Sequence, residues 1–243
     1  MKVAIVTGSS KGIGKACAIR LAKDGYTVVV NYSHSDEEAQ KVLQTIKDNG
    51  GDGMTYKADV TDPEQVKKMM RDVFKAYGSI DVLVNNAGIV RDEFLLALQK
   101  ETMDKCFELN VKGYVYCAQS AVLKMMKQKH GVIINMSSVS SKLALPGQAV
   151  YSATKGAVNS MTQTLAKELA GYGIRVNAVC PGFIATEMIE AIPEEKREEY
   201  LKNIPLKRLG TGEDVANVVA ALASDDFSYV TGQCIVLDGG LSL

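Results

Sequence analysis

Tyr151 and Lys155 are four residues apart in the amphipathic stretch 150–170, so on a helix both side chains lie on one face. A free phenol has a pKa near 10, which is too high for easy proton exchange at neutral pH. An ammonium about 5 Å away, at an effective dielectric near 20, favours the phenolate by about 3 kcal/mol. The pair therefore predicts a lowered pKa for Tyr151 and proton transfer to a substrate oxygen.

Ser138 stands thirteen residues before Tyr151, directly after a short β-branched run. Its hydroxyl can donate a hydrogen bond to a carbonyl oxygen and hold that group for attack. Hydrolysis by this serine is disfavoured, because the sequence has no G-x-S-x-G and neither His34 nor His130 lies near Ser138. Together with Tyr151 and Lys155, Ser138 favours reduction of a ketone over acyl transfer.

A glycine-rich turn follows the first apolar run, as Thr7-Gly8-Ser9-Ser10-Lys11-Gly12-Ile13-Gly14. Glycines let the backbone turn tightly and approach a pyrophosphate, and the helix that follows presents free N–H groups and a positive dipole end. An ordinary strand-to-helix turn is the alternative. The position between a strand and a helix favours dinucleotide binding.

Short β-branched runs alternate with helical stretches along the chain, which predicts an α/β fold. Near-continuous apolar strands are typical of a parallel sheet covered on both faces. We therefore expect a single domain over residues 1–243, with a doubly wound, Rossmann-like, seven-stranded parallel sheet and helices on both faces. The predicted strands are Val3–Thr7, Thr27–Asn31, Met54–Lys57, Val82–Asn85, Val132–Asn135, Arg175–Val179 and Cys234–Leu237.

Some element boundaries have local causes. Asp62 before Pro63 predicts a helix start, since an acidic cap and a proline at the first helical position both favour one. Helices are expected to end, with positive φ, at Gly25, Gly50, Gly78 and Gly171.

Residues 187–205 break the alternation, and no further strand is expected until about residue 234. The segment is charged and contains two prolines, and it follows the sixth strand at the edge where ligands bind. It is expected to form a lid over the substrate. A solvated surface helix is the alternative.

Composition excludes several classes of function. The 243 residues are 47% hydrophobic and 23% charged, with 28 basic and 28 acidic side chains, so nothing favours nucleic acid or an anionic membrane. No apolar run approaches a membrane span, and the first residues resemble a strand and not a signal peptide, which predicts a cytoplasmic protein. Five widely spaced cysteines and two distant histidines predict neither disulfides nor a metal site.

The motifs resemble those of the short-chain dehydrogenase/reductase family, whose patterns are T-G-x-x-x-G-x-G, N-N-A-G and S…Y-x-x-x-K. The matching residues run from Thr7 to Gly240. The resemblance implies catalytic roles for Ser138, Tyr151, Lys155 and Asn110, with Ser138 also touching the substrate, Asn110 holding a water that joins Lys155, and Lys155 bonding the nicotinamide ribose. It implies cofactor contacts from Gly8, Ser10, Lys11, Gly12, Ile13, Gly14, Asn31, Ser33, Asp59, Val60, Asn86, Ala87, Gly88, Tyr151, Lys155, Pro181, Gly182 and Ile184.

The cofactor is predicted to be NADP(H). An acidic residue at the end of the second strand would select NAD, but that strand ends at Asn31 and no acid follows until Asp36. Neither Asn31 nor Ser33 would repel a 2′-phosphate, and Lys11 offers it a positive charge.

Within the family the chain is most similar to the β-ketoacyl-acyl carrier protein reductases, through the stretches 86–92, 127–131, 181–188 and 205–210. The resemblance implies NADPH-dependent reduction of a 3-ketoacyl thioester in fatty acid synthesis, an acidic carrier protein as partner, and a homotetramer. Tyr172 stands where a basic residue is expected, so an acyl-CoA substrate stays open. A dehydrogenase of a different secondary alcohol, such as a sugar or steroid, and a non-catalytic dinucleotide-binding regulator are the competing functions.

Overall fold

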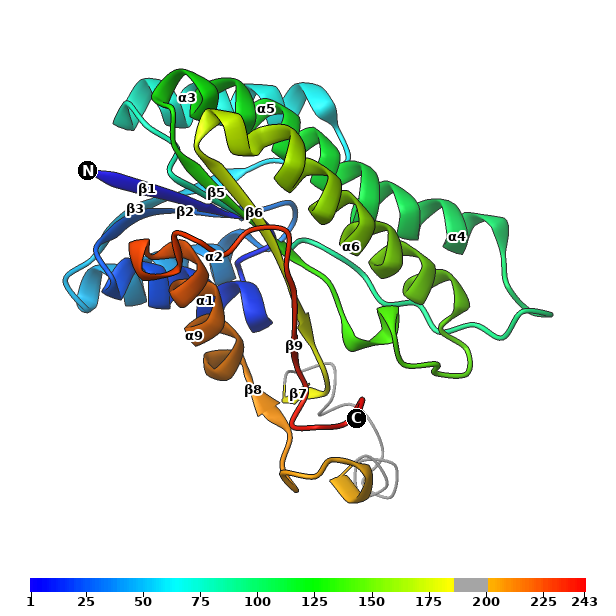
Figure 1. The fold of residues 1–243 in the computed structure, drawn as a ribbon. Helices are drawn as coiled ribbons and strands as arrows, with labels where there is room; N and C mark the ends of the chain where they lie inside the picture. The colour runs from blue at the N-terminus through cyan, green and yellow to red at the C-terminus, as the bar shows by residue number, and fades with distance from the viewer. Residues whose placement is uncertain (186–200) are drawn as a thin grey trace.

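The core is one parallel sheet with strand order β3-β2-β1-β4-β5-β6-β9, in a computed structural model that describes residues 1–185 and 201–243 (Figure 1). All pairings within this sheet are parallel. The predicted seven-stranded doubly wound sheet is therefore confirmed, and each predicted run lies on a strand. The strands are β1 (Lys2–Val6), β2 (Tyr26–Tyr32), β3 (Asp52–Lys57), β4 (Val82–Asn85), β5 (Gly131–Met136), β6 (Ile174–Pro181) and β9 (Cys234–Leu237).

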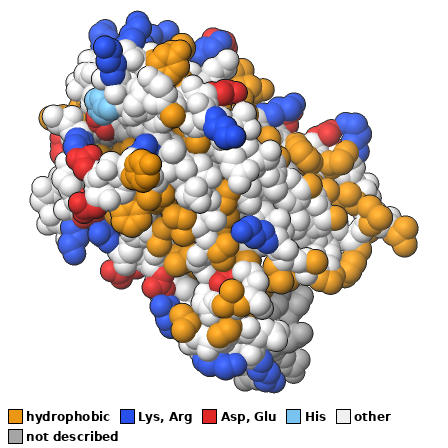
Figure 2. Space-filling view, in the orientation of Figure 1, with side chains coloured by type: hydrophobic (Ala, Val, Ile, Leu, Met, Phe, Trp, Pro, Cys, Tyr) orange, Lys and Arg blue, Asp and Glu red, His pale blue; other side chains and the backbone are white. Residues whose placement is uncertain are grey.

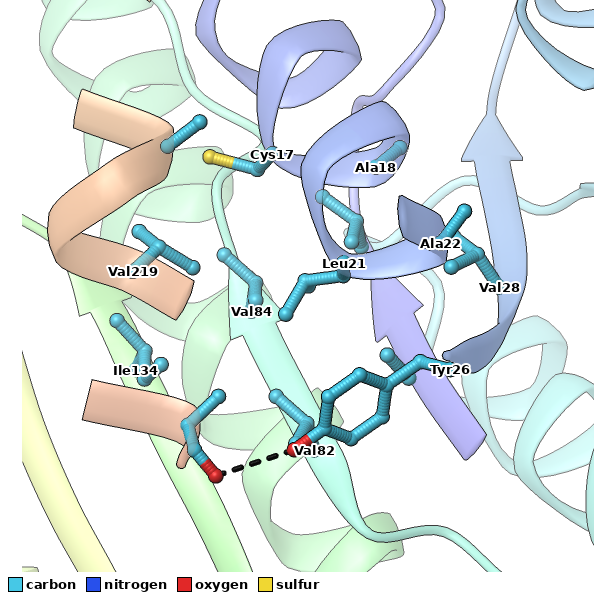
Figure 3. Packing of buried hydrophobic residues seen from close by; sticks show 14 of the residues in the cluster. Cys17, Ala18, Leu21, Ala22, Tyr26, Val28, Val82, Val84, Ile134 and Val219 are labelled. Atoms are coloured by element: carbon cyan, nitrogen blue, oxygen red, sulfur yellow. Dashed lines mark hydrogen bonds between the residues drawn. The ribbon is translucent and has the colours of Figure 1, made fainter. Parts of the chain in front are cut away.

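Helices cover both faces of the sheet, and each layer has its own apolar core (Figure 1). On one face lie α1 (Gly12–Lys23), α2 (Asp36–Asp48) and α9 (Gly212–Ala223), and on the other α3 (Pro63–Tyr77), α4 (Lys100–Phe107), α5 (Gly113–Gln128) and α6 (Ala149–Leu169). In the first layer Leu21 of α1 and Val219 of α9 pack against the sheet, and the Tyr26 hydroxyl donates to the Ala223 carbonyl at 3.1 Å (Figure 3).

The strand order reverses between β1 and β4, which sends the chain outward in both directions from this point. Open parallel sheets bind their ligands at such a switch point, beyond the carboxyl ends of the strands. Because β1 and β4 are neighbouring parallel strands, the turn after β1 lies beside the turn after β4.

Most predicted boundaries have the expected causes. The Asp62 carboxylate caps α3 by accepting from the backbone N–H groups of Glu64 and Gln65, and Gly78 ends that helix with a φ of 79°. The prediction for Gly171 was wrong: this residue lies inside a short 3₁₀ turn, Ala170–Tyr172, and Gly173 has the positive φ, 72°. The extra turn moves the left-handed position two residues along the chain.

Two short strands were missed. β7 (Ile184–Ala185) pairs in parallel with β8 (Gly210–Thr211), so the prediction of no strand before residue 234 was wrong. Two residues are too few for a period-2 pattern, and only the long-range pairing defines them.

The predicted lid at 187–205 lies mostly outside the described residues. No helix of the described part is both long and apolar enough to cross a membrane.

Candidate active site

The glycine turn sits between β1 and α1 and packs closely against the turn after β4. Gly8 and Gly12 have φ values of 60° and 55°, in the left-handed region that favours glycine. A Cβ on Gly8 would lie 2.9 Å from the Ala87 Cα, and one on Gly14 would lie 2.5 Å from the Asn86 Nδ2. Glycine is therefore required here both by backbone conformation and by space.

Hydrogen bonds lock the two turns together. The Thr7 hydroxyl accepts from the backbone N–H groups of Asn86 and Ala87 at 2.9 and 3.0 Å. The Asn86 amide donates to the carbonyls of Thr7 and Gly8 at 2.9 and 3.1 Å. Thr7 belongs to the glycine-turn motif, but its role in holding the second turn was not predicted.

The cradle fits the pyrophosphate of a dinucleotide. Lys11 is the N-cap residue of α1 and has an extended backbone. Its side chain makes no capping hydrogen bond, so it does not occupy the first backbone N–H groups of the helix. A positive dipole end and glycines that bring the backbone close are what a diphosphate needs. Lys11 and Gly12 are exposed, Ser10 is buried, and Ile13 packs partly against the first core.

Asn31 is fully engaged within the protein. Its side chain is buried, accepts from Gly8 N at 3.3 Å, and donates to the carbonyls of Tyr56 and Ala58 at 3.2 and 3.0 Å. It therefore shapes the glycine turn from beneath. The first acid after β2, Asp36, accepts a hydrogen bond from the Tyr32 hydroxyl.

Ser33 follows β2, and Asp59 and Val60 follow β3, so all three lie at the carboxyl edge of the sheet, where the glycine turn also lies. The Ser33 hydroxyl is 2.8 Å from His34 Nδ1, and Asp59 accepts from the Thr61 backbone and hydroxyl at 2.9 and 2.8 Å. Val60 is buried in the second core. These positions suit the adenosine half of a dinucleotide.

Lys155 projects from α6 into the protein interior beneath Tyr151. Its Nζ lies 5.7 Å from the centroid of the Tyr151 ring and donates to the Met136 carbonyl at 2.8 Å. A Cβ on Gly88 would lie 3.7 Å from this nitrogen, so the turn after β4 reaches the same place. The predicted four-residue spacing thus brings the amine and the phenol to one face, next to the dinucleotide cradle.

Ser138 follows β5 and belongs to a hydrogen-bonded chain. Its hydroxyl donates to Ser140 Oγ at 3.2 Å, Ser140 donates to Gln148 Oε1 at 2.8 Å, and the Gln148 amide donates to Asp92 at 3.3 Å. Ser138 also acts on Tyr151, whose pKa it lowers. Ser140, Gln148 and Asp92 were not predicted, since no fixed spacing links the loops that carry them.

Burial controls the acid–base properties of the pair. It raises the pKa of Tyr151 to about 12, against a hydrogen bond from Ser138 that lowers it. Burial also lowers the pKa of Lys155 to about 8. The predicted lowering of the tyrosine pKa was therefore wrong for the protein without ligand, because removal of both groups from water disfavours the charged form of each.

These shifts predict how stability depends on pH. Between about pH 8 and 10.5 the folded protein binds fewer protons at Lys155 than the unfolded chain does, so the unfolding free energy should rise with pH. The rise should total about 3 kcal/mol. Above pH 10, Tyr151 acts in the opposite direction, since its folded-state pKa is raised to about 12. Urea unfolding of wild type and Lys155→Met from pH 7.5 to 9.5 checks this, and the same slope in both proteins would contradict it.

Asn110 interrupts the helix between α4 and α5. It lies in a π-helical turn, Glu108–Lys112, and its side chain is fully buried. The amide accepts from Ile89 N at 2.8 Å and donates to the Ile89 carbonyl at 2.9 Å and to Thr154 Oγ1 at 3.2 Å. Asn110 thereby ties the turn after β4 to the helix that carries Tyr151 and Lys155.

Pro181 ends β6, Gly182 follows it and Ile184 begins β7, and all three were expected to contact the cofactor. Gly182 N donates to the Leu237 carbonyl at 2.9 Å, and a Cβ on Gly182 would lie 2.6 Å from the Asp238 Cβ. The Ile184 side chain is buried in the first core, so this residue offers a ligand mainly its backbone. No cluster of three or more metal-ligating side chains occurs within 1–185 and 201–243.

Comparison with known proteins identifies the family. A family model described as enoyl-(acyl carrier protein) reductase matches residues 8–242. A curated relative, the 3-oxoacyl-[acyl-carrier-protein] reductase FabG of Staphylococcus aureus strain Mu50, is 47% identical over 99% of this chain and 98% of its own length. The FabG of Thermotoga maritima is 47% identical over 99% of this chain and 97% of its own. The chain belongs to the short-chain dehydrogenase/reductase family.

Solved structures of this family have the same fold. The acetoin dehydrogenase YohF of Salmonella typhimurium matches with a TM-score of 0.90 and 36% identity, over 99% of this chain and 95% of that one. A Sinorhizobium meliloti protein assigned as a short-chain alcohol dehydrogenase matches with a TM-score of 0.93 and 33% identity, over 99% and 96%. Members of the short-chain dehydrogenase/reductase family use a nicotinamide dinucleotide, and the glycine cradle fits one.

An apolar pocket of this short-chain dehydrogenase/reductase lies near the start of the helix that carries Tyr151 and Lys155, and neither of these residues is part of its lining. It lies between the loop before α4 and the start of α6, and its lining includes Phe94, Leu95, Leu145, Pro146, Ala149 and Ser152. Figure 2 shows hydrophobic side chains gathered at the right edge of the molecule, where that loop lies, and Phe94, Leu95 and Leu96 are all strongly exposed.

Proposed function

We propose that the protein reduces a 3-ketoacyl thioester, linked to acyl carrier protein or CoA, to the 3-hydroxyacyl form with NADPH in fatty acid synthesis. The observation that carries the proposal is near full-length identity of 44–47% to several 3-oxoacyl-[acyl-carrier-protein] reductases. The assembled Ser138, Tyr151 and Lys155 support it, because binding alone, in a non-catalytic regulator, would need no proton donor.

The site residues divide the work of ketone reduction. Bound NADPH supplies the hydride. The Ser138 hydroxyl turns from Ser140 to donate to the substrate carbonyl oxygen, and Tyr151 donates a proton to that oxygen. A phenol whose pKa is about 12 keeps its proton at neutral pH, which is the state that a donor needs. Lys155, with a pKa of about 8, is mostly charged there and offsets the negative charge left on the tyrosine.

Asn110 supports this proton transfer indirectly in the proposal. Both N–H groups of its side chain are donated, to the Ile89 carbonyl and to Thr154 Oγ1, and the residue lies in the π-helical turn, so the proposal assigns a water near Lys155 to the Asn110 backbone carbonyl. The apolar pocket suits the hydrocarbon of an acyl chain.

Loss of NADPH absorbance with a panel of substrates tests the function. Acetoacetyl-CoA, a carrier-linked 3-ketoacyl thioester, crotonyl-CoA, acetoin and a set of sugars are each supplied at equal concentration. We expect turnover with the ketoacyl thioesters. Crotonyl-CoA is included because the matching family model is described by reduction of an enoyl group. Reduction of crotonyl-CoA alone would overturn the proposal.

A dehydrogenase of a small secondary alcohol is the second candidate. It is favoured by the likeness to acetoin dehydrogenase, at 36% identity and a TM-score of 0.90. Both candidates use the same three catalytic residues, so only the substrate loops distinguish them. Turnover of acetoin but not of ketoacyl thioesters would favour this second function.

The choice of NADP over NAD is assigned to Lys11. No carboxylate stands at the end of β2 itself, where Asn31 is engaged with the backbone, and the first acid that follows, Asp36, accepts from the Tyr32 hydroxyl. Replacing Lys11 by Ala is expected to weaken NADPH binding roughly tenfold, through loss of an exposed charge on the 2′-phosphate. NADH binding should not change. Fluorescence titration with both cofactors measures this, and an unchanged NADPH/NADH ratio would contradict it.

Charged residues at the end of α5 bear on whether acyl carrier protein or CoA carries the acyl group of the substrate. Lys129 offers a positive charge at the end of α5 with a φ of 59°, whereas Tyr172 is exposed and uncharged. Charge reversal at Lys127 and Lys129 should lower kcat/KM for the carrier-linked substrate and not for acetoacetyl-CoA, if the carrier docks at this helix end.

Association into a homotetramer in the cytoplasm completes the proposal. Exposed apolar side chains on α4 and α5, among them Met103, Val115 and Leu123, support contact with further copies. Light scattering after gel filtration gives the mass, and a monomer at micromolar concentration would contradict it.

A further inference from the structure

Tyr114 is a buried phenol beside the catalytic lysine that no step of the proposed reaction uses. It lies at the start of α5 and is 1% exposed. Its hydroxyl donates to the Met136 carbonyl at 3.1 Å. Its ring centroid is 5.2 Å from Lys155 Nζ, closer than the 5.7 Å to the Tyr151 ring.

The hydrogen bonds around this phenol have a definite direction. Lys155 Nζ donates to the Met136 carbonyl at 2.8 Å and lies 3.5 Å from the Tyr114 oxygen. The single Tyr114 proton is directed at the same carbonyl, so the oxygen presents a lone pair to the ammonium. Tyr114 therefore acts as an acceptor for Lys155, and its ring adds a favourable cation–π contact.

Few further groups could stabilise a charge at this position. The titratable side chains that act on the Lys155 amine or its tyrosine partners are Tyr151 on its own helix, Tyr114 and Cys117 on α5, Cys180 on β6, Cys106 on α4 and Asp92 in the loop before α4. The carboxylate among them, Asp92, acts on Tyr151, and the described contacts of the Lys155 amine include no carboxylate. The buried ammonium therefore depends on neutral oxygen acceptors, and the described contacts supply two of them, the Met136 carbonyl and the Tyr114 hydroxyl.

We propose that Tyr114 is a positioning residue, which holds the Lys155 amine charged and aimed beneath Tyr151 through its hydroxyl and its ring. Its effect on turnover rests on the proposed function. Its effect on the charge of Lys155 does not, because the contacts exist without substrate or cofactor.

Tyr114→Phe tests the proposal through a pH profile. The variant keeps the ring and loses the acceptor, so the charged form of Lys155 loses support and should lose its proton about one pH unit lower. The fall of kcat/KM on the alkaline side should move down by the same amount. The ratio of wild-type to variant rates should be roughly tenfold larger at pH 8.5 than at pH 6. A loss that is equal at all pH values would indicate only a structural role and would overturn the proposal.

A second readout needs no cofactor or turnover. The rise of unfolding free energy with pH that Lys155 causes should begin about one pH unit lower in Tyr114→Phe than in wild type. Tyr114→Leu, which also removes the ring, should shift it further. If wild type reduces no ketoacyl thioester, the proposed function fails, yet this readout still decides the role of Tyr114.

Tyr116 offers a matched control two residues along the same helix. It packs against the second core, and its substitution removes a hydroxyl from α5 without touching Lys155. Tyr116→Phe should leave both pH profiles at the wild-type position. An equal shift in the two variants would assign the effect to the helix and not to the Tyr114 contact.

Discussion

Tyr151→Phe is expected to lower kcat for ketone reduction by about 10² to 10⁴-fold, the usual contribution of a positioned proton donor. The substitution removes only the hydroxyl, and the ring remains near Lys155 Nζ at the distance seen in the wild type, 5.7 Å. Because the lost interaction develops with charge on the substrate oxygen, KM should change little. Steady-state rates with acetoacetyl-CoA at fixed NADPH measure this.

Two controls make the result specific to proton transfer. NADPH binding by the variant should fall only slightly, since the hydroxyl of Tyr151 makes no described bond to the glycine turn that would hold the pyrophosphate, and only its own expected cofactor contact is lost. The unfolding midpoint should also be close to that of wild type. A variant that keeps more than a tenth of the rate would show that another group delivers the proton.

Gly14→Ala is expected to disturb both stability and cofactor affinity. A Cβ at this position would lie 2.5 Å from Asn86 Nδ2 and 2.6 Å from the Gly8 carbonyl oxygen, so the two joined turns must move apart. Overpacking of this kind costs roughly 1–3 kcal/mol. NADPH affinity should fall at least tenfold, because the displaced backbone is what approaches the pyrophosphate. Urea unfolding and fluorescence titration measure the two effects.

Gly156→Ala is the matched control for this change. Gly156 lies within α6, where an added Cβ would meet nothing within 4 Å. Alanine should therefore stabilise the helix by about 0.5–1 kcal/mol and leave cofactor binding unchanged. Equal losses at Gly14 and Gly156 would mean that the crowding at the glycine turn is unimportant.

Local patterns were sufficient to predict the sheet and to single out the candidate site residues. Most of the seven strands are rich in β-branched residues, although β3 contains only Thr55, and Tyr151, Lys155 and Gly8 belong to short motifs with fixed spacing. The seven strands were found for this reason, as was the shared face of the catalytic pair.

The missed features are tertiary. No motif in the sequence singles out Tyr114, and only the tertiary packing of α5 brings its hydroxyl to Lys155. The pKa of Tyr151 was predicted in the wrong direction, since spacing reveals a nearby charge but not the loss of water around both groups. The donation of the Asn31 amide to the carbonyls of Tyr56 and Ala58, 25 and 27 residues along the chain, could not be predicted from local pattern either.

The lock between the two turns has a consequence for how the protein is made. Thr7 and Asn86 are 79 positions apart, so the first turn leaves the ribosome long before its partner. A nascent chain that ends before β4 lacks the clamp from Asn86 and has no neighbour for that edge of β1. Bound dinucleotide should therefore stabilise the nascent polypeptide only after the turn that follows β4 has been synthesised. Shorter products should be substrates for proteases and chaperones.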